Sequence, residues 1–233
     1  MLIRGISLDA AGTIIKIKKP VAQTYTEMAN RNGIPIEEAS IAQAFRTVFP
    51  RMSPLAFGGT GADLDRQERE WWRSLVRNCL GRFGQHKGFN AFFDELYRYY
   101  SQPESWQVYD DVRPLLATLH ARGIPTVVVS NFDSRLHGIL RGFSLHDSFR
   151  EVLCSSEVGS AKPDAKIFSA GCEVLGLPPE QVLHIGDDRR ADYHGAHGAG
   201  LLARWLNRTS TAGDEQETQQ IKSFDDIPRL LED

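Results

Sequence analysis

The chain is poor in cysteine, which limits the cross-links it can carry. Its 233 residues include three cysteines, at positions 79, 154 and 172. The odd number and the absence of a CxxC pair argue against a disulfide framework and against a zinc site. We therefore expect all three thiols to be buried and to behave as small apolar side chains.

Long apolar runs and a large excess of one charge are also missing. No stretch approaches the roughly 18 apolar residues of a membrane-spanning helix, and Met1 leads directly into an apolar, strand-like run at 2–8 without a charged leader segment. The net charge is −3, and there is no broad basic field for nucleic acid. We expect a cytoplasmic protein, a monomer or weak dimer, that binds neither membranes nor nucleic acid.

What the sequence does contain is a repeated alternation of strand and helix patterns. Short apolar runs ending at small or polar residues predict buried strands at residues 2–8, 125–129, 181–185 and 201–203, with a weaker strand at 151–155. Helical patterns fall at residues 112–122, 134–142, 165–175 and 190–199. The alternation predicts an α/β core with a Rossmann-like parallel sheet. A polar run at 207–220 predicts a linker before a short closing helix at 224–231.

The stretch from about residue 21 to 106 breaks this alternation. It shows no clear strand, and its helical patterns lie at residues 21–32, 37–49, 65–83 and 89–100. We interpret it as an all-helical subdomain inserted into the α/β core. The predicted division is 1–18 with 107–233 for the core, and 19–106 for the helical insert.

Polar side chains follow three of the predicted strands where each strand ends, namely Asp9, Ser130 with Asn131, and Asp187 with Asp188. Ligands of an open parallel sheet bind at this edge, so we expect these side chains to converge there. Carboxylates placed close together stay ionised only beside a cation, and hard oxygen ligands favour Mg²⁺. Lys162, before Pro163, could help the metal to neutralise a phosphate monoester, and Ser130 could donate to its oxygens.

Four motifs in this order resemble those of the haloacid dehalogenase-like superfamily. They are Leu-Asp-Ala-Ala-Gly-Thr at 8–13, Val-Ser-Asn at 129–131, Lys-Pro-Asp at 162–164 and Gly-Asp-Asp-Arg-Arg-Ala-Asp at 186–192. Each motif alone is weak, but together they span nearly the whole chain. The helical insert resembles that superfamily's mobile cap of the helical type. Residues 71–72, 105–108 and 130–136 resemble more closely the subgroup of haloacid dehalogenase-like hydrolase domain-containing protein 3, also called rhythmically expressed gene 2-like.

The resemblance implies a Mg²⁺-dependent hydrolase, a phosphatase acting on a small phosphorylated metabolite. Asp9 would be the nucleophile that forms an aspartyl-phosphate, and Lys162 would hold Asp9 and the phosphoryl group together. The substrate-binding residues implied are Ser130, Asn131, Lys162 and Thr13. The metal ligands implied are Asp9, the backbone carbonyl of Ala11, Asp187 and, from the outer metal shell, Asp192 with Asp188 as its competitor.

The first motif departs from the superfamily's phosphatases, which usually carry a second aspartate two residues after the nucleophile. That residue protonates the leaving oxygen and later activates water, whereas this chain has Ala11. General acid–base help is typically worth ~10²–10⁴-fold. Its loss leaves open a slow phosphatase, one limited to good leaving groups, or a catalytically weak protein that binds phosphate or a partner.

Two other reactions stay open as well. A 2-haloacid dehalogenase also lacks the second aspartate, but it needs no metal and its last motif is less acidic. A phosphonatase, which cleaves a C–P bond, resembles this chain in having alanine at the first motif, but it needs a cap lysine to form a Schiff base. The candidate lysines are Lys16, Lys18, Lys19 and Lys87, for each of which an exposed surface residue is the plainer interpretation. We interpret His184 as a hydrogen-bonded core residue outside the site.

Overall fold

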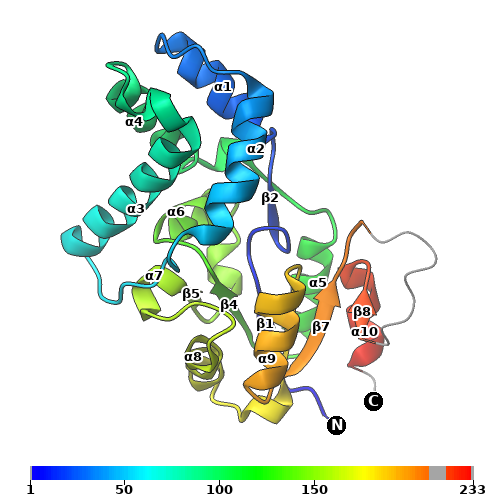
Figure 1. The fold of residues 1–233 in the computed structure, drawn as a ribbon. Coiled ribbons are helices and arrows are strands. Elements are labelled where there is room, and N and C mark those ends of the chain that lie inside the picture. Colours follow the sequence, from blue (N-terminus) through cyan, green and yellow to red (C-terminus); the bar gives the residue numbers. More distant parts are fainter. Residues whose placement is uncertain (1, 210–218, 232–233) are drawn as a thin grey trace.

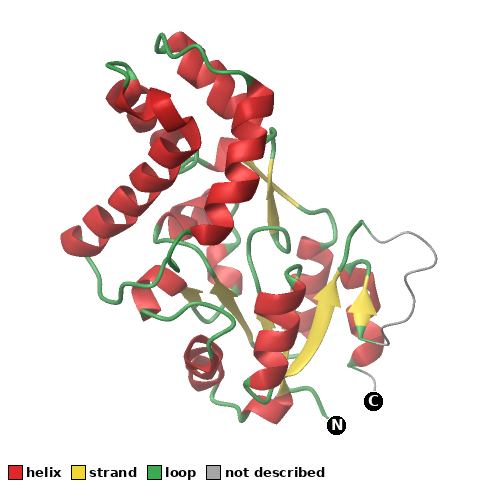
Figure 2. Cartoon of the chain, viewed as in Figure 1, coloured by secondary structure: helices red, strands yellow, loops and turns green. Residues whose placement is uncertain are grey.

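A six-stranded parallel sheet forms the centre of the computed structural model, which describes residues 2–209 and 219–231 (Figures 1 and 2). Its strands are β1 (Gly5–Leu8), β4 (Thr126–Ser130), β5 (Val152–Cys154), β6 (Val182–Gly186), β7 (Leu202–Leu206) and β8 (Gln220–Ile221). Their spatial order is β5-β4-β1-β6-β7-β8, and every pairing is parallel. The predicted α/β core with a parallel sheet is confirmed.

Helices cover both faces of the sheet, which explains why its central strands β1, β4 and β6 are buried along their whole length. Side chains alternate along a strand, so Val128 joins one buried cluster while Val127 and Val129 join another. The first cluster includes side chains of α5 (Val112–Ala121) and α6 (Arg135–Gly142). The second includes those of α8 (Ala165–Leu175) and α9 (Gly195–Gly198). Shorter elements are α7 (Ser155–Val158), α10 (Ile227–Leu230) and 3₁₀ turns at Phe49–Arg51, Gly81–Gln85, Pro103–Ser105, His146–Ser148, Pro179–Gln181 and Phe224–Asp226.

Four helices stand together above the carboxyl edge of the sheet in Figure 1, and we call them the cap helices. They are α1 (Val21–Arg31), α2 (Glu38–Val48), α3 (Ala62–Leu80) and α4 (Phe89–Tyr99). Each corresponds to a helical pattern predicted from the sequence. Their buried side chains, Phe92 and Phe93 among them, form an apolar cluster separate from the two at the sheet. The division into domains at residues 18/19 and 106/107 stays a prediction.

An antiparallel ribbon of β2 (Ile15–Ile17) and β3 (Trp106–Val108) carries the chain into and out of the cap helices. The sequence analysis missed it because each strand has three residues, too few to show a period of two. The helix predicted at 190–199 is instead a π-helical turn, Arg189–His194, followed by α9. Most of the predicted linker at 207–220 falls on residues 210–218, which lie outside the described residues.

Among the described residues, no helix combines the length and apolar character needed to cross a membrane.

Candidate active site

The site lies where three adjacent strands end. Leu8, the last residue of β1, pairs with Val128 of β4 on one side and with Ile185 of β6 on the other. Because all three strands are parallel, the residues that follow them emerge at one edge of the sheet. Asp9 and Asp187 follow β1 and β6, and Ser130 is the last residue of β4, so the convergence expected from the sequence is present.

The Asp9 carboxylate is buried and held on one oxygen by two donors. Ser130 Oγ donates to Asp9 Oδ1 over 3.0 Å, and Lys162 Nζ donates to the same oxygen over 2.6 Å. Lys162 Nζ also lies 2.6 Å from Asp192 Oδ1, so one buried ammonium joins two buried carboxylates. A lysine in that position can also neutralise charge on a group bound to Asp9.

Asp187 adds a third carboxylate beside the two that Lys162 contacts. Oxygen atoms of Asp9, Asp187 and Asp192 all lie within 4.8 Å of one another. Glycines make room for them: a Cβ at Gly12, whose φ is +95°, would overlap the Asp187 carboxylate, and a Cβ at Gly186 would overlap that of Asp192. An all-oxygen donor set of this kind suits a hard divalent cation.

Burial, with the neighbouring charges, perturbs the ionisation of the cluster. Asp187 as a whole is exposed, but protein packed around its carboxyl group raises the pKa of that group to about 7. The negative charges of Asp9 and Asp192 raise this pKa further. Burial also raises the pKa of Asp9, against the opposing effect of Lys162. For Asp192 the same burial is outweighed by Lys162 and His184, which hold its pKa well below the usual range. A divalent cation would supply the positive charge that one lysine cannot.

Asp188 and Asp192 are separated by what their carboxylates contact. Asp188 Oδ1 accepts from the backbone N–H groups of Arg190 and Ala191, at 2.8 and 2.7 Å, and thereby caps the π-helical turn. Asp192 Oδ2 accepts from the backbone N–H of Asp188 over 2.8 Å, while its Oδ1 faces Lys162. The structure therefore brings Asp192 into the cluster and leaves Asp188 as a capping residue.

His184, left outside the site by the sequence analysis, lies fully buried behind Asp192. Its Nε2 is 3.3 Å from Asp192 Oδ1, and its Nδ1 is 2.8 Å from Ser7 Oγ. Burial lowers the pKa of His184, which favours a neutral ring that orients the Asp192 carboxylate. The available signal was its place on a strand two residues before Gly186, but the sequence does not show which side chains touch across strands.

The remaining predicted residues surround the cluster. Thr13 is fully buried, and its Oγ1 donates to Asp187 Oδ1 over 3.2 Å. The Asn131 side chain exchanges two hydrogen bonds with the backbone of Lys162, donating over 2.9 Å and accepting over 2.7 Å, which fixes the segment that carries the ammonium. Ala11 is partly exposed at the cleft. Its methyl side chain can neither donate nor accept a proton.

A cleft of about 680 Å³ separates the site from the cap helices. Asn131 and Lys162 line it from the core, and the cap contributes mainly apolar and aromatic side chains, including Phe45, Phe49, Met52, Trp71 and Trp72. The two parts are joined beside it by Glu68 of α3, whose buried carboxylate accepts from Ser134 N, Ser134 Oγ and Ser156 Oγ at 3.0, 2.5 and 2.6 Å. The cleft thus has a charged floor and an apolar roof.

The sequence profile of the haloacid dehalogenase-like hydrolases matches residues 3–200. The chain belongs to this family. Among its relatives, haloacid dehalogenase-like hydrolase domain-containing protein 3 of Danio rerio is 33% identical over 236 residues, covering 99% of this chain and 97% of that protein. The resemblance inferred from the four motifs is confirmed, and so is the closer resemblance to this subgroup.

Solved structures of haloacid dehalogenase-like hydrolases share the fold. The hydrolase YfnB from Bacillus subtilis, bound to magnesium, superimposes with a TM-score of 0.73 at 20% identity, over 99% of both chains. L-2-Haloacid dehalogenase from Xanthobacter autotrophicus superimposes with a TM-score of 0.72 at 20% identity, again over 99% of both chains. The chain is a hydrolase by family, and its acidic cluster provides a possible site for the divalent metal typical of that family.

Replacing Lys162 by methionine in this haloacid dehalogenase-like hydrolase is expected to destabilise the fold. The substitution leaves the buried carboxylates of Asp9 and Asp192 without their shared cation, and breaking a buried ion pair costs about 3–5 kcal/mol. The free energy of unfolding in urea, measured with excess chelator, checks this. Lys166→Met, at an exposed position on α8, is the matched control and should change it by less than about 0.5 kcal/mol. Equal effects of the two substitutions would contradict the buried pairing.

Proposed function

We propose that the protein is a Mg²⁺-dependent phosphatase that acts on a small phosphorylated molecule through an aspartyl-phosphate on Asp9. The observation that carries the proposal is the setting of the Asp9 carboxylate. It is buried against Lys162 Nζ and Ser130 Oγ, and two further carboxylates lie within 4.8 Å of it. With a divalent cation among the carboxylates, this arrangement would suit attack on a dianionic ester better than attack on a neutral group.

In the first half-reaction, an oxygen of Asp9 attacks the phosphorus of the ester. The bond between phosphorus and the leaving oxygen breaks, and that oxygen takes a proton from water. Ser130 Oγ, which donates to Asp9 in this structure, and the backbone N–H of Asn131 donate to the phosphoryl oxygens. Lys162 Nζ keeps the nucleophile and the phosphoryl group close by charge attraction.

In the second half-reaction, water attacks the phosphorus and the bond to Asp9 breaks. Inorganic phosphate leaves, and the free carboxylate is restored beside Lys162. The residues that would hold Mg²⁺ are Asp9, Asp187 and the backbone carbonyl of Ala11, with Asp192 supporting them. When bound, the ion supplies positive charge that offsets the negative charge of the transferring group.

The apolar roof of the cleft indicates what the substrate carries besides phosphate. Phe49, Trp71 and Trp72 face the cleft from the cap, and Lys16 and Arg190 also line it. A small phosphate ester with an apolar or aromatic portion would match these surfaces, and the helical cap, residues 19–106, would set specificity through them.

A cytoplasmic monomer or weak dimer remains our prediction for the protein as a whole.

The same residues provide arguments against the two competing reactions, dehalogenation and C–P bond hydrolysis. Dehalogenation needs no metal, whereas three clustered carboxylates with one lysine call for a further cation. A C–P hydrolase needs a reactive cap-side lysine. Lys16 lines the cleft with its ammonium over the Tyr109 ring, while Lys18 and Lys19 contact Glu104 and Glu27, and Lys87 is exposed. A further candidate is a protein that binds phosphate or a partner and turns over little, because Ala11 cannot act as an acid or a base.

A series of phosphate esters with increasingly poor leaving groups tests the proposal and the consequence of Ala11 together. Wild-type turnover should fall steeply from aryl to alkyl esters, because no side chain at position 11 protonates the leaving oxygen. Ala11→Asp should raise alkyl-ester turnover by about 10²-fold and flatten the dependence. Ala11→Asn, of nearly the same size but without an acid, should not.

The outcomes separate the alternatives. A wild-type protein that hydrolyses none of the esters would refute the phosphatase proposal. Halide release from a 2-haloacid in the same preparation would then favour dehalogenation, and tight phosphate binding without turnover would favour the binding protein. An equal gain in Ala11→Asn would show that proton donation is not what the site lacks.

A further inference from the structure

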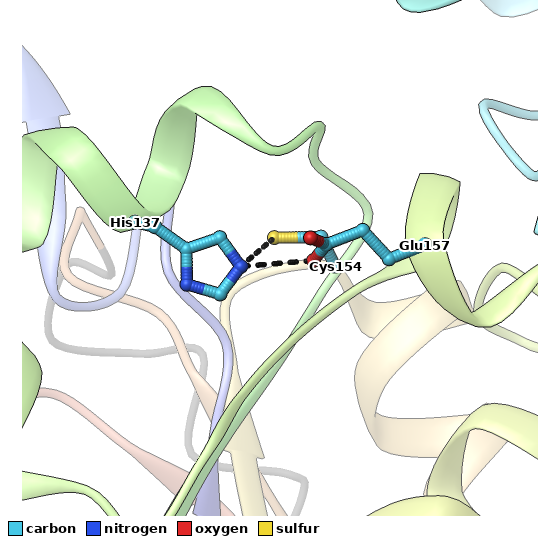
Figure 3. Close-up of side chains that lie close together, drawn as sticks. All are labelled: His137, Cys154 and Glu157. Carbon is cyan, nitrogen blue, oxygen red and sulfur yellow. Dashed lines mark hydrogen bonds and ion pairs between the residues drawn. The ribbon is translucent and has the colours of Figure 1, made fainter. Parts of the chain in front are cut away.

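A second cluster of metal-binding side chains lies at the edge of the sheet, outside the acidic site (Figure 3). Cys154 is the last residue of β5, the edge strand, Glu157 follows on α7, and His137 comes from α6. One ligand atom from each lies within 4.8 Å of the others. Figure 3 shows the imidazole, the thiol and the carboxylate pointing toward one another.

The three groups face a common point that is open on one side. His137 Nε2 is 2.9 Å from Glu157 Oε2 and 4.0 Å from Cys154 Sγ. Cys154 is fully buried, while the side chains of His137 and Glu157 keep 18% and 26% of their surface exposed. Gly59 and Thr60, from the connection between the cap helices α2 and α3, line the adjoining cavity. A fourth ligand can therefore approach from that cavity.

Hydrogen bonding along two histidines leaves His137 Nε2 able to bind a metal ion. His137 Nδ1 lies 3.2 Å from His146 Nε2, and His146 Nδ1 lies 3.3 Å from Asp147 Oδ1. The Asp147 side chain is fully exposed, so water can also satisfy it and the ring N–H groups can point along the chain in either direction.

Directing the hydrogen bonds toward Asp147 gives a consistent arrangement. His146 Nδ1 donates to Asp147, His137 Nδ1 donates to His146 Nε2, and the lone pair of His137 Nε2 points at Glu157 and Cys154. A metal-bound histidine is held in this way by a partner on its other nitrogen. In this arrangement a cation between His137 Nε2 and the Glu157 carboxylate would take up that lone pair.

We propose that His137 Nε2, Cys154 Sγ and the Glu157 carboxylate form a Zn²⁺ site, with a water molecule in the fourth position on the cavity side. Sulfur and nitrogen donors select zinc over magnesium, and three protein ligands with one open position are a common zinc arrangement. Binding forms the metal–sulfur bond and releases the thiol proton to solvent. The odd number of cysteines and the absence of a CxxC pair had argued against a zinc site, but the fold brings a histidine of α6 beside Cys154 and Glu157.

Cobalt substitution tests the site through its sulfur ligand. The full-length protein, freed of metal and kept in excess Mg²⁺ to occupy the acidic cluster, is titrated with Co²⁺. The expected result is a sulfur-to-cobalt charge-transfer band that saturates at one equivalent and disappears when Zn²⁺ is added. Cys154→Ser should abolish the band, and Cys172→Ser, at another buried cysteine, should keep it.

His137→Gln provides a second variant in case Cys154→Ser does not fold, which circular dichroism would show. It should weaken Co²⁺ and Zn²⁺ binding at least about tenfold. It should also remove the rise in melting temperature that Zn²⁺ gives the wild type. A wild-type protein without the band, or variants that bind as it does, would overturn the proposal and leave a hydrogen bond between His137 and Glu157 as the whole interaction.

Discussion

Asp9→Asn is expected to reduce aryl-phosphate hydrolysis by ~10⁴-fold or more, the scale of loss seen when an enzyme loses its nucleophile. The amide has nearly the same shape as the carboxylate, but it is a poor nucleophile and leaves Lys162 with Asp192 as the remaining one of the two carboxylates that it contacts. Initial rates with saturating Mg²⁺ measure the effect. Folding of the variant is checked by its melting temperature.

A small effect of Asp9→Asn on the rate would indicate a different nucleophile. If Asp9→Asn kept more than about a tenth of the wild-type rate, phosphorus would not be attacked by this side chain, and a water molecule activated elsewhere would have to be sought. Ser130→Ala separates the two cases, because its hydroxyl assists only at Asp9 and the group bound there. It should lose about 10²–10³-fold, the usual cost of one donor to a developing negative charge.

Removal of divalent metal is expected to abolish turnover, and added Mg²⁺ should restore it fully. Without a cation, the crowded carboxylates of Asp9, Asp187 and Asp192 repel a phosphate dianion, and protonation of Asp187 is the other way to relieve the repulsion. Rates are measured in excess chelator and again after Mg²⁺ is added back. Turnover that persists in chelator would contradict a metal-assisted reaction and favour dehalogenase-like chemistry.

The two adjacent aspartates offer a matched pair for locating the metal. Asp187→Asn should raise the Mg²⁺ concentration needed for half-maximal turnover by at least about tenfold, since a direct carboxylate ligand is lost. Asp188→Asn should change it little, because the Asp188 carboxylate caps a helical turn and asparagine caps almost as well. The reverse order would exchange the roles that the geometry gives them.

Much of the fold was predictable because its strands and helices leave strong local patterns. The apolar runs before Asp9, before Asn131 and before Asp187 became β1, β4 and β6, and parallel pairing placed their ends together. The expectation that all three cysteines are buried and free of disulfides was also correct. These features depend on residues near one another in the chain or on general rules of sheet topology.

What the sequence could not reveal depends on contacts between distant residues. His184 of β6 contacts Ser7 on the neighbouring strand β1 and Asp192 in the turn after β6, and no local pattern shows these contacts. The choice between Asp188 and Asp192 depends on a π-helical turn, because the wider turn directs one carboxylate to its own N–H groups and the other to Lys162. Glu68 lies within the helix predicted at 65–83, and nothing in that local pattern shows that it joins the cap to the core.

Trapping the phosphorylated protein tests the central claim most directly. The wild type is mixed with an aryl phosphate and Mg²⁺, quenched in acid within one turnover, and analysed by peptide mass spectrometry. The account predicts one phosphoryl group on the peptide that contains Asp9, removable by hydroxylamine as an acyl phosphate should be, and absent from Asp9→Asn and from samples with chelator. Turnover without any trapped phosphoryl group, or a label that persists in Asp9→Asn, would contradict an aspartyl-phosphate on Asp9.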